Sequence, residues 1–271
     1  MSCERLELLY EAAGLPAFDL PADLAACYGG SLGFTEPRLI ANFVATLDGV
    51  VSIPSLPGSN RVIAGASAAD RFVMGLLRAC CDAVVIGAGT LAASPTSVWT
   101  PERAFPDARG GFAELRRRLG RSADPELVVL SASGLLDAKH PALRAGALLL
   151  TSDLGAERLE GRLPAASRAL SLGAASVLEP GRVVAELGER GHRLILAEGG
   201  PHAIAPFLGA GLVHELFLTL SPLLLGRPGD DPRLALVEGA DLLAAGQPAA
   251  RLLGVRRATD HLFLRYALAG H

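Results

Sequence analysis

Two glycine-rich turns are the segments of this sequence with the clearest chemical use. The first follows the apolar run Asp82–Ile86 and reads G-A-G-T over Gly87–Thr90. The second follows Leu194–Ala197 and reads E-G-G-P over Glu198–Pro201. Glycine lets backbone N–H groups approach a ligand, and a following helix points its positive end there, so each turn is typical of an anion site. Two such turns indicate a ligand with a long phosphate-bearing spine, such as a dinucleotide.

The first turn and Ala92 together fit the dinucleotide pattern G-x-G-x-x-A. The Rossmann form of that pattern also needs an acidic residue about 20 positions later, at the end of the next strand. Asp107 has this spacing but lies in a predicted loop, and the next strand ends at Ser131. A hydroxyl there suits a 2′-phosphate better than a free 2′-hydroxyl, which favours NADPH over NADH. The alternative for the first turn is a plain strand-to-helix connection. For the second turn it is that Glu198 offsets the dipole of the following helix and that the paired glycines only allow close helix–strand packing.

Strands alternate with helices along most of the chain. Strands are predicted at residues 38–47, 82–86, 126–130, 147–151, 169–172, 194–197 and 213–220. Helices are predicted from Ser67, whose spacing to Asp70 forms a capping box, over 114–119 and 181–190, and from Pro201. The C-terminus reads as a hairpin of 251–257 and 261–268. This order predicts an α/β fold with a mostly parallel, mixed sheet and an antiparallel closing edge.

The first 36 residues differ from the rest. Leu6, Leu9, Tyr10 and Ala13 recur at helical spacing before two prolines interrupt the pattern. We therefore expect an N-terminal helical arm over residues 1–36 and one larger α/β domain over residues 37–271.

Composition excludes several classes of protein. With 25 basic and 28 acidic residues the chain lacks the positive footprint of a nucleic-acid binder. The six histidines show no metal-ligand spacing, so no metal is expected. No apolar run reaches the roughly 18 residues that would span a membrane, and the N-terminus is not a signal peptide. The four cysteines form no C-x-x-C, so reduced structural thiols and a cytoplasmic location are expected.

Three blocks, in order, resemble the riboflavin-pathway pyrimidine reductases. They are N-F-V-A-T-L-D-G at Asn42–Gly49, L-R-A through G-A-G-T at Leu77–Thr90, and E-G-G-P with G-L-V-H-E-L and S-P within Glu198–Pro222. Leu262–Tyr266 is similar to the family's closing strand. The resemblance implies a three-layer, dihydrofolate-reductase-like fold, a homodimer, a small-molecule substrate and NADPH as the hydride donor. It implies reduction of the ribosylamino group of a pyrimidine phosphate to a ribitylamino group.

The resemblance also assigns residues. Thr46 and Asp48 become the catalytic candidates, and Asn42, Asp48 and Gly49 the substrate-binding candidates. The cofactor-binding candidates are Gly87, Ala88, Gly89, Thr90, Ser131, Glu198, Gly199 and Gly200. For Asp48 the alternative is a turn role, because Asp-Gly after an apolar strand is a common turn signal. For Asn42 it is a satisfied polar group on a strand.

The chain departs from the family pattern on the substrate side. Val50 stands where the family often has lysine, and Ala92–Ser97 lacks the arginine of the family's phosphate-binding stretch. His214 replaces an aspartate, and there is no zinc signature of a fused deaminase. Two alternatives therefore stay open: a paralogous NADPH-dependent reductase of another heterocycle or carbonyl, and a nucleotide-binding protein without catalysis.

Overall fold

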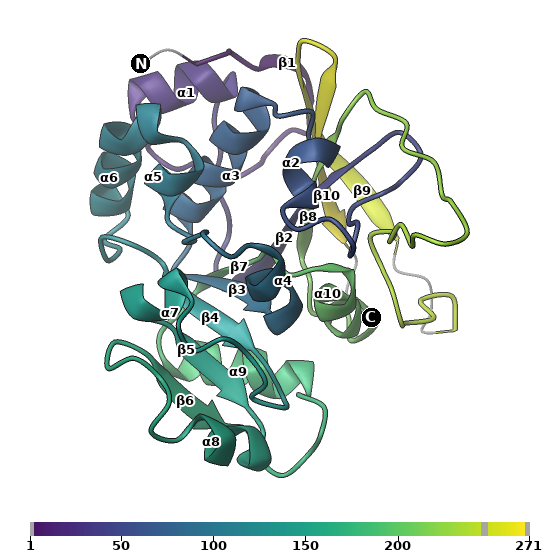
Figure 1. Cartoon of the computed structure of the whole chain (residues 1–271). Coiled ribbons are helices and arrows are strands. Elements are labelled where there is room, and N and C mark those ends of the chain that lie inside the picture. Colours follow the sequence, from purple (N-terminus) through teal and green to yellow (C-terminus); the bar gives the residue numbers. More distant parts are fainter. Residues whose placement is uncertain (1–2, 245–248, 269–271) are drawn as a thin grey trace.

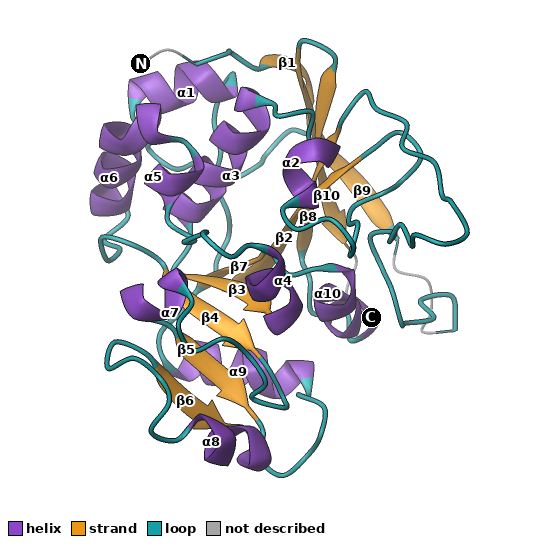
Figure 2. Ribbon diagram, in the orientation of Figure 1, coloured by secondary structure: helices purple, strands orange, loops and turns teal. Residues whose placement is uncertain are grey.

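Ten strands of the described residues form one mixed sheet, and helices pack on both of its faces (Figures 1 and 2). The computed structural model describes residues 3–244 and 249–268. The strands are β1 (Glu7–Glu11), β2 (Arg38–Ala45), β3 (Ala83–Gly87), β4 (Glu126–Leu130), β5 (Leu148–Thr151), β6 (Arg168–Ser171), β7 (Leu194–Ala197), β8 (Glu215–Leu220), β9 (Ala250–Ala258) and β10 (His261–Leu268). The helices are α1 (Ala22–Tyr28), α2 (Ser59–Ile63), α3 (Ala68–Cys80), α4 (Ala88–Ala93), α5 (Pro101–Ala104), the 3-10 turn η1 (Pro106–Ala108), α6 (Arg109–Arg118), α7 (Pro141–Ala145), α8 (Asp153–Leu159), α9 (Pro180–Glu189) and α10 (Pro201–Gly209).

The strand order is β1-β9-β10-β8-β2-β7-β3-β4-β5-β6. The seven strands from β8 to β6 in this order are parallel, whereas β10, β9 and β1 pair antiparallel. The predicted mixed sheet with a closing antiparallel hairpin is confirmed. β3 and β7 are buried along their whole length, as expected for parallel strands covered on both faces.

Apolar side chains divide between the two faces of the sheet. Ile40 of β2 faces a core built with Phe72 of α3 and Phe112 of α6. Its neighbour Leu39 faces the other core, with Val183 of α9 and Phe207 of α10. This alternation follows from the two-residue period of a strand, and it places α3 and α10 on opposite sides of the same central strands.

Helix α3 is fixed at both ends. The Ser67 hydroxyl accepts a hydrogen bond from the Asp70 backbone N–H at 3.2 Å, so the predicted cap is confirmed. At the other end the buried Arg116 guanidinium donates to the carbonyls of Arg78, Ala79 and Cys81 at 3.0, 3.3 and 2.7 Å. These bonds satisfy the last carbonyls of the helix and place positive charge at its negative end.

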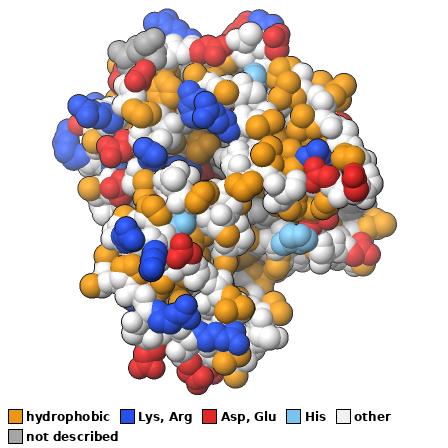
Figure 3. Space-filling view, in the orientation of Figure 1, with side chains coloured by type: hydrophobic (Ala, Val, Ile, Leu, Met, Phe, Trp, Pro, Cys, Tyr) orange, Lys and Arg blue, Asp and Glu red, His pale blue; other side chains and the backbone are white. Residues whose placement is uncertain are grey.

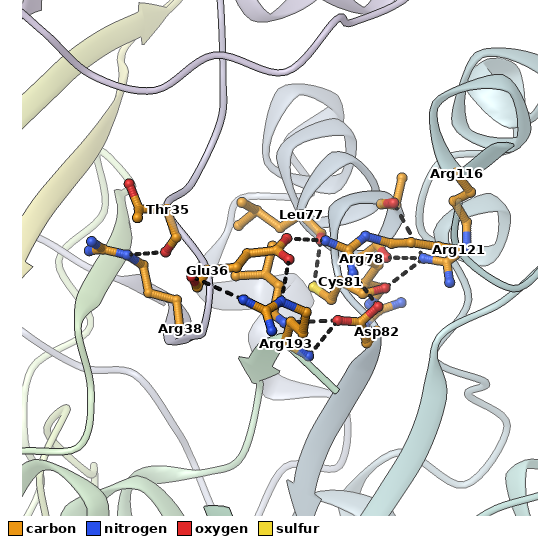
Figure 4. Close-up of polar contacts among 12 residues, drawn as sticks. Thr35, Glu36, Arg38, Leu77, Arg78, Cys81, Asp82, Arg116, Arg121 and Arg193 are labelled. Carbon is orange, nitrogen blue, oxygen red and sulfur yellow. Dashed lines mark hydrogen bonds and ion pairs between the residues drawn. The ribbon is translucent and has the colours of Figure 1, made fainter. Parts of the chain in front are cut away.

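Asp82 ties the start of β3 to the start of β7 (Figure 4). Its Oδ2 accepts hydrogen bonds from the backbone N–H groups of Arg193 and Leu194, both at 2.8 Å. Its Oδ1 pairs with Arg121, which also pairs with Glu36. Partial burial acts to raise the pKa of Asp82, but the bonds from Arg121 and the backbone outweigh it and the pKa is lowered. The carboxylate therefore stays ionised and holds the two strands in register.

The helix predicted over residues 6–13 is wrong. Residues Glu7–Glu11 form β1, the edge strand, which pairs antiparallel with β9. Leu6 is 3% exposed and belongs to the core, but Leu9 and Tyr10 are 49 and 46% exposed, so the apolar residues that predicted a helix do not form one buried face. Backbone pairing with β9, which the local sequence does not signal, decides the conformation. Residues 1–2 of the predicted arm (1–36) and residues 269–271 of the predicted domain (37–271) lie outside the described residues.

The expectation of four reduced thiols is also wrong for one pair, because Cys3 and Cys27 form a disulfide. The Leu6 N–H donates to the Cys27 carbonyl at 2.8 Å, so the segment before β1 lies against α1. Cys80 and Cys81 are free and buried, and burial raises the pKa of Cys80 to about 12. These two are the structural thiols that the sequence predicts.

We expect the buried ion pairs of Glu215 to stabilise the sheet far more than an exposed pair does. Glu215 bonds Arg265 at 2.7 Å and Arg38 at 3.0 Å, and both Glu215 and Arg265 are 3% exposed. Glu215→Ala leaves buried guanidinium charge uncompensated and should lower the free energy of unfolding by about 3–5 kcal/mol.

Glu7→Ala is the matched control, because it removes an exposed strand-to-strand partner of Arg257. It should cost less than about 1 kcal/mol. Urea unfolding measures both variants, and equal losses would contradict this account.

Candidate active site

The two glycine turns lie side by side. β3 and β7 are parallel neighbours, so their carboxyl ends, and the turns that follow them, meet at one edge of the sheet. The Gly200 N–H donates to the Thr90 hydroxyl at 2.9 Å and joins the turns directly. Ligands of parallel sheets bind at this edge.

Packing explains two of the glycines. A Cβ on Gly199 would lie 2.9 Å from Cβ of Ala203 in α10, and a Cβ on Gly87 would lie 3.1 Å from the same atom. Both glycines therefore allow α10 to approach the strands. Gly89 is different, since beyond its chain neighbours and the backbone of its own helix no described atom lies within 4 Å of the place its Cβ would take. It leaves free space at the turn that a bound group can use.

A cavity of about 1180 Å³ opens at the turns. Its lining runs from Leu130 and Ala132 at the end of β4, past both turns, to Asn42 of β2 and Asp70 of α3. Figure 3 shows the corresponding face hollowed near its centre, with apolar and arginine side chains around the hollow. The volume exceeds the few hundred Å³ of a typical small-ligand site, as expected for a cofactor and a substrate bound together.

Glu198 is fixed by Arg78 of α3. The guanidinium donates to Glu198 Oε2 from Nε and NH2 at 2.9 and 2.7 Å, and NH1 donates to the Thr100 carbonyl at 3.3 Å. Both side chains are less than a tenth exposed. Glu198 Oε1 is buried and has no hydrogen-bond partner among the described residues, although the residue lines the cavity. Such an orphaned acceptor is expected where a ligand donates a hydrogen bond.

Asp70 is a second carboxyl group in the cavity lining, and it lies two helical turns before Arg78 on α3. It is 7% exposed. Burial raises the pKa of Asp70, against the smaller opposing effects of the Thr219 hydroxyl and His261. The sequence predicts Asp70 only as part of a helix cap, and it includes Arg78 only within the L-R-A block, without a role of its own. The signal for both was the i, i+4, i+8 spacing of Asp70, Met74 and Arg78, which places them on one helix face.

Thr46, Asp48 and Gly49 are absent from the described residues that line the cavity. The Thr46 hydroxyl donates to Asp48 and accepts from the Val50 N–H at 3.0 Å. Asp48 also accepts from the N–H groups of Leu225 and Gly226 at 3.3 and 2.7 Å. The Thr46 hydroxyl and these N–H groups lower the pKa of Asp48. These are turn contacts, with Gly49 at φ +79°, and the catalytic and substrate roles stay predictions.

Of the other predicted site residues, all but Ser131 line the cavity. Asn42, Gly87, Ala88, Gly89, Thr90, Glu198, Gly199 and Gly200 line the cavity. Ser131 is 5% exposed and follows β4, but the residues of this end that contribute to the lining are Leu130 and Ala132. The structure therefore brings together most of the predicted cofactor residues and Asn42, while Ser131 lies just beyond them.

The described residues hold no group of three or more His, Cys, Asp or Glu side chains placed to bind a metal ion. Within the same ranges, none of the helices has both the length and the apolar character needed to cross a bilayer.

The sequence matches the model of the RibD C-terminal domain over residues 37–261. The chain belongs to this family. A pyrimidine reductase-like protein from Corynebacterium diphtheriae shares 21% identity and a TM-score of 0.67, over 87% of this chain and 93% of that one. Riboflavin biosynthesis reductase Rib7 from Saccharomyces cerevisiae shares 13% identity and a TM-score of 0.58, over 89% and 94%. No curated protein sequence matches the chain significantly.

The match to RibD of Acinetobacter baumannii has 20% identity and a TM-score of 0.61, and it covers 90% of this chain but 60% of that protein. The predicted dihydrofolate-reductase-like architecture, a mixed sheet between helical layers, is confirmed. By family and fold the chain is a reductase of the riboflavin-pathway pyrimidine type.

We expect the two turns to tolerate an added methyl group differently. Gly199→Ala forces a Cβ against Ala203 and should destabilise the fold by about 1–3 kcal/mol, as overpacking usually does. Gly89→Ala meets open space inside α4 and should be neutral or stabilising by up to about 1 kcal/mol. Thermal unfolding of the ligand-free variants measures both, and a larger loss for Gly89→Ala would contradict the packing argument.

Proposed function

We propose that this chain transfers a hydride from NADPH to a ribosylamino-pyrimidine phosphate and gives the ribitylamino product. The observation that carries the proposal is the pair of glycine turns, joined by the Gly200–Thr90 bond and opening on one large cavity. This arrangement suits a dinucleotide that crosses both turns, with a substrate beside its nicotinamide.

The residues at the turns fit the cofactor. The free space at Gly89 is a place that a Cβ would fill, and the backbone of Gly87–Thr90 and of Gly199–Gly200 borders the cavity there. NADPH, when bound, supplies the hydride, and the protein fixes its geometry. Glu198 Oε1, held in place by Arg78, accepts a hydrogen bond from the bound ligands.

The preference for the 2′-phosphate comes from the family and is supported by charge near the end of β4. Arg158 of α8 donates to the Ser133 carbonyl at 2.9 Å, which places a guanidinium beside the segment after Ser131. Neutralising a phosphate by arginine is a common way to select NADPH.

The substrate phosphate has cationic partners despite the missing arginine after Thr90. Arg71 of α3 and Arg103 of α5 line the same cavity, together with Asn60, Ser94 and Ser97. Arginine recognises phosphate through paired N–H donors. Asn42 of β2 lines the same cavity and is suited to orient the substrate.

A homodimer in the cytoplasm also belongs to the proposal, and both features rest on the family. The Cys3–Cys27 disulfide is more typical of oxidising compartments and argues the other way for location.

Activity is tested by following NADPH oxidation when the ring-opened ribosylamino-pyrimidine phosphate is added to the protein. We expect turnover with NADPH and much weaker turnover with NADH. Turnover only with a different heterocycle or carbonyl would select the paralogous reductase. Binding of NADPH without any turnover would select a nucleotide-binding protein.

Gly89→Ala tests the cofactor site. The added methyl group occupies the space next to the turn, so NADPH affinity should fall about 10- to 100-fold, equivalent to one or two lost charge-assisted hydrogen bonds. Titration calorimetry measures the loss in a variant whose folding is intact. Ala156→Gly, in α8 and outside the cavity, is a methyl-group control that should bind NADPH as the parent does. Unchanged affinity of Gly89→Ala would argue against a dinucleotide at this turn.

A further inference from the structure

The cavity has two chemically different ends. The glycine turns follow β3 and β7, near the middle of the sheet, and the apolar end lies past them at β4. The opposite end lies over β2 and β8, where Asn42 and Asp70 belong to the lining and Thr219 of β8 acts on the Asp70 carboxyl. A dinucleotide that crosses the turns with its adenosine at β4 places its nicotinamide, and therefore the reacting atoms, towards the β2 end.

Two carboxyl groups reach this part of the cavity, and their surroundings differ. Glu198 receives two hydrogen bonds from Arg78. No described cation makes an ion pair with Asp70, which is buried beside a hydroxyl group. Two carboxyl groups with surroundings this different are the usual mark of an acid and a charged partner within one site.

We infer that Asp70 is the general acid of this site, and that it delivers a proton to the substrate while the hydride arrives from the cofactor. The inference rests on the proposed function, because it assigns the proton for that reduction. Asp70 is suited to the task by its place at the β2 end of the cavity, on a helix fixed at both ends by Ser67 and Arg116.

The atoms of the step balance. The hydride of NADPH bonds to the carbon of the substrate C=N group, whose π electrons move to nitrogen. That nitrogen takes the carboxylic proton of Asp70, giving the amine, NADP⁺ and the Asp70 carboxylate. Water at the cavity mouth returns a proton to Asp70 before the next cycle.

The charged groups around Asp70 act on its pKa in both directions, since Arg71 and His261 lower it and Glu198 raises it. Arg71, the next residue, donates to the Ala66 carbonyl at 2.9 Å. The His261 ring of β10 lies 3.0 Å from the Ala64 carbonyl, so its Nε2 is the donor in that contact. Glu198 acts on Asp70 in the direction that favours the protonated form. Burial is the largest of these influences, and it raises the pKa of Asp70.

Asp70→Asn tests the chemical role. Loss of a general acid typically lowers the rate by about 10²- to 10⁴-fold, so we expect kcat to fall within that range while the Kd for NADPH changes less than about twofold. In the parent protein kcat should decrease as pH rises through the pKa of Asp70, and this limb should disappear in Asp70→Asn. Asp153→Asn removes a first-turn carboxylate of α8, outside the cavity, and should leave rate and pH profile unchanged.

A structural role for Asp70 at the start of α3 predicts a different result. It would make Asp70→Asn less stable and leave the pH profile as in the parent. If Asp70 instead keeps its proton in the native state, Asp70→Asn should be as stable as the parent protein or more stable. Between the unfolded pKa, about 3.9, and the raised folded pKa the native state binds more protons, so stability falls as pH rises through this window. Asp70→Asn avoids this loss and should melt no lower than the parent at neutral pH.

A titration decides the question without turnover. Carboxyl ¹³C NMR of the NADPH-bound protein, with Asp70→Asn to assign the resonance, should show Asp70 keeping its proton above the usual range of aspartate. A pKa within or below that range would overturn the inference even if the pyrimidine is not the substrate. Turnover of the pyrimidine by the parent, with an unchanged rate and pH profile in Asp70→Asn, would overturn it while leaving the proposed function intact.

Discussion

The site depends on the parallel pairing of β3 with β7. Asp82 fixes the two strands at their starts, through bonds to the N–H groups of Arg193 and Leu194. At the other end Gly87 and Gly199 let α10 pack against both strands, since Ala203 lies where either glycine would carry a Cβ. Because register and packing are fixed at both ends, two turns far apart in the sequence open on one cavity.

Helix α3 gives this cavity its chemical polarity. The helix buries Phe72, Leu76 and Leu77 in the core and presents Asp70 and Arg78 to the cavity. Arg78 balances the charge of Glu198, so the buried carboxylate there is compensated. Asp70 has no such partner among the described residues, and its burial opposes ionisation. The core packing of α3 holds Asp70 and Arg78 in place. A buried acid such as Asp70 destabilises the fold, and such a cost is common where activity depends on the buried group.

The sequence predicts the parallel strands, the closing hairpin and the two glycine turns, because apolar runs and glycine spacing are local signals. It misses β1, whose conformation follows from pairing with β9, and it misses the Cys3–Cys27 disulfide, which joins residues without a recognisable spacing. It also misses the Arg78–Glu198 pair for the same reason, since only the tertiary fold brings α3 to the turn after β7. Local patterns therefore identify the glycine turns better than the charged side chains that line the cavity beside them.

The T-L-D-G stretch makes structural contacts of its own, and its predicted catalytic and substrate roles stay predictions. Thr46 and Asp48 bond each other, and Asp48 holds the backbone of Leu225 and Gly226, so their polar atoms are already used by the protein. A carboxylate with a lowered pKa is also a poor proton donor at neutral pH. The bonds of Asp48 fix the loop after β2, the strand that carries Asn42 in the cavity lining. Other polar side chains of the described cavity lining, among them Asn42 of β2, Arg71 of α3 and Arg103 of α5, make no such turn contacts with the backbone of Leu225 and Gly226.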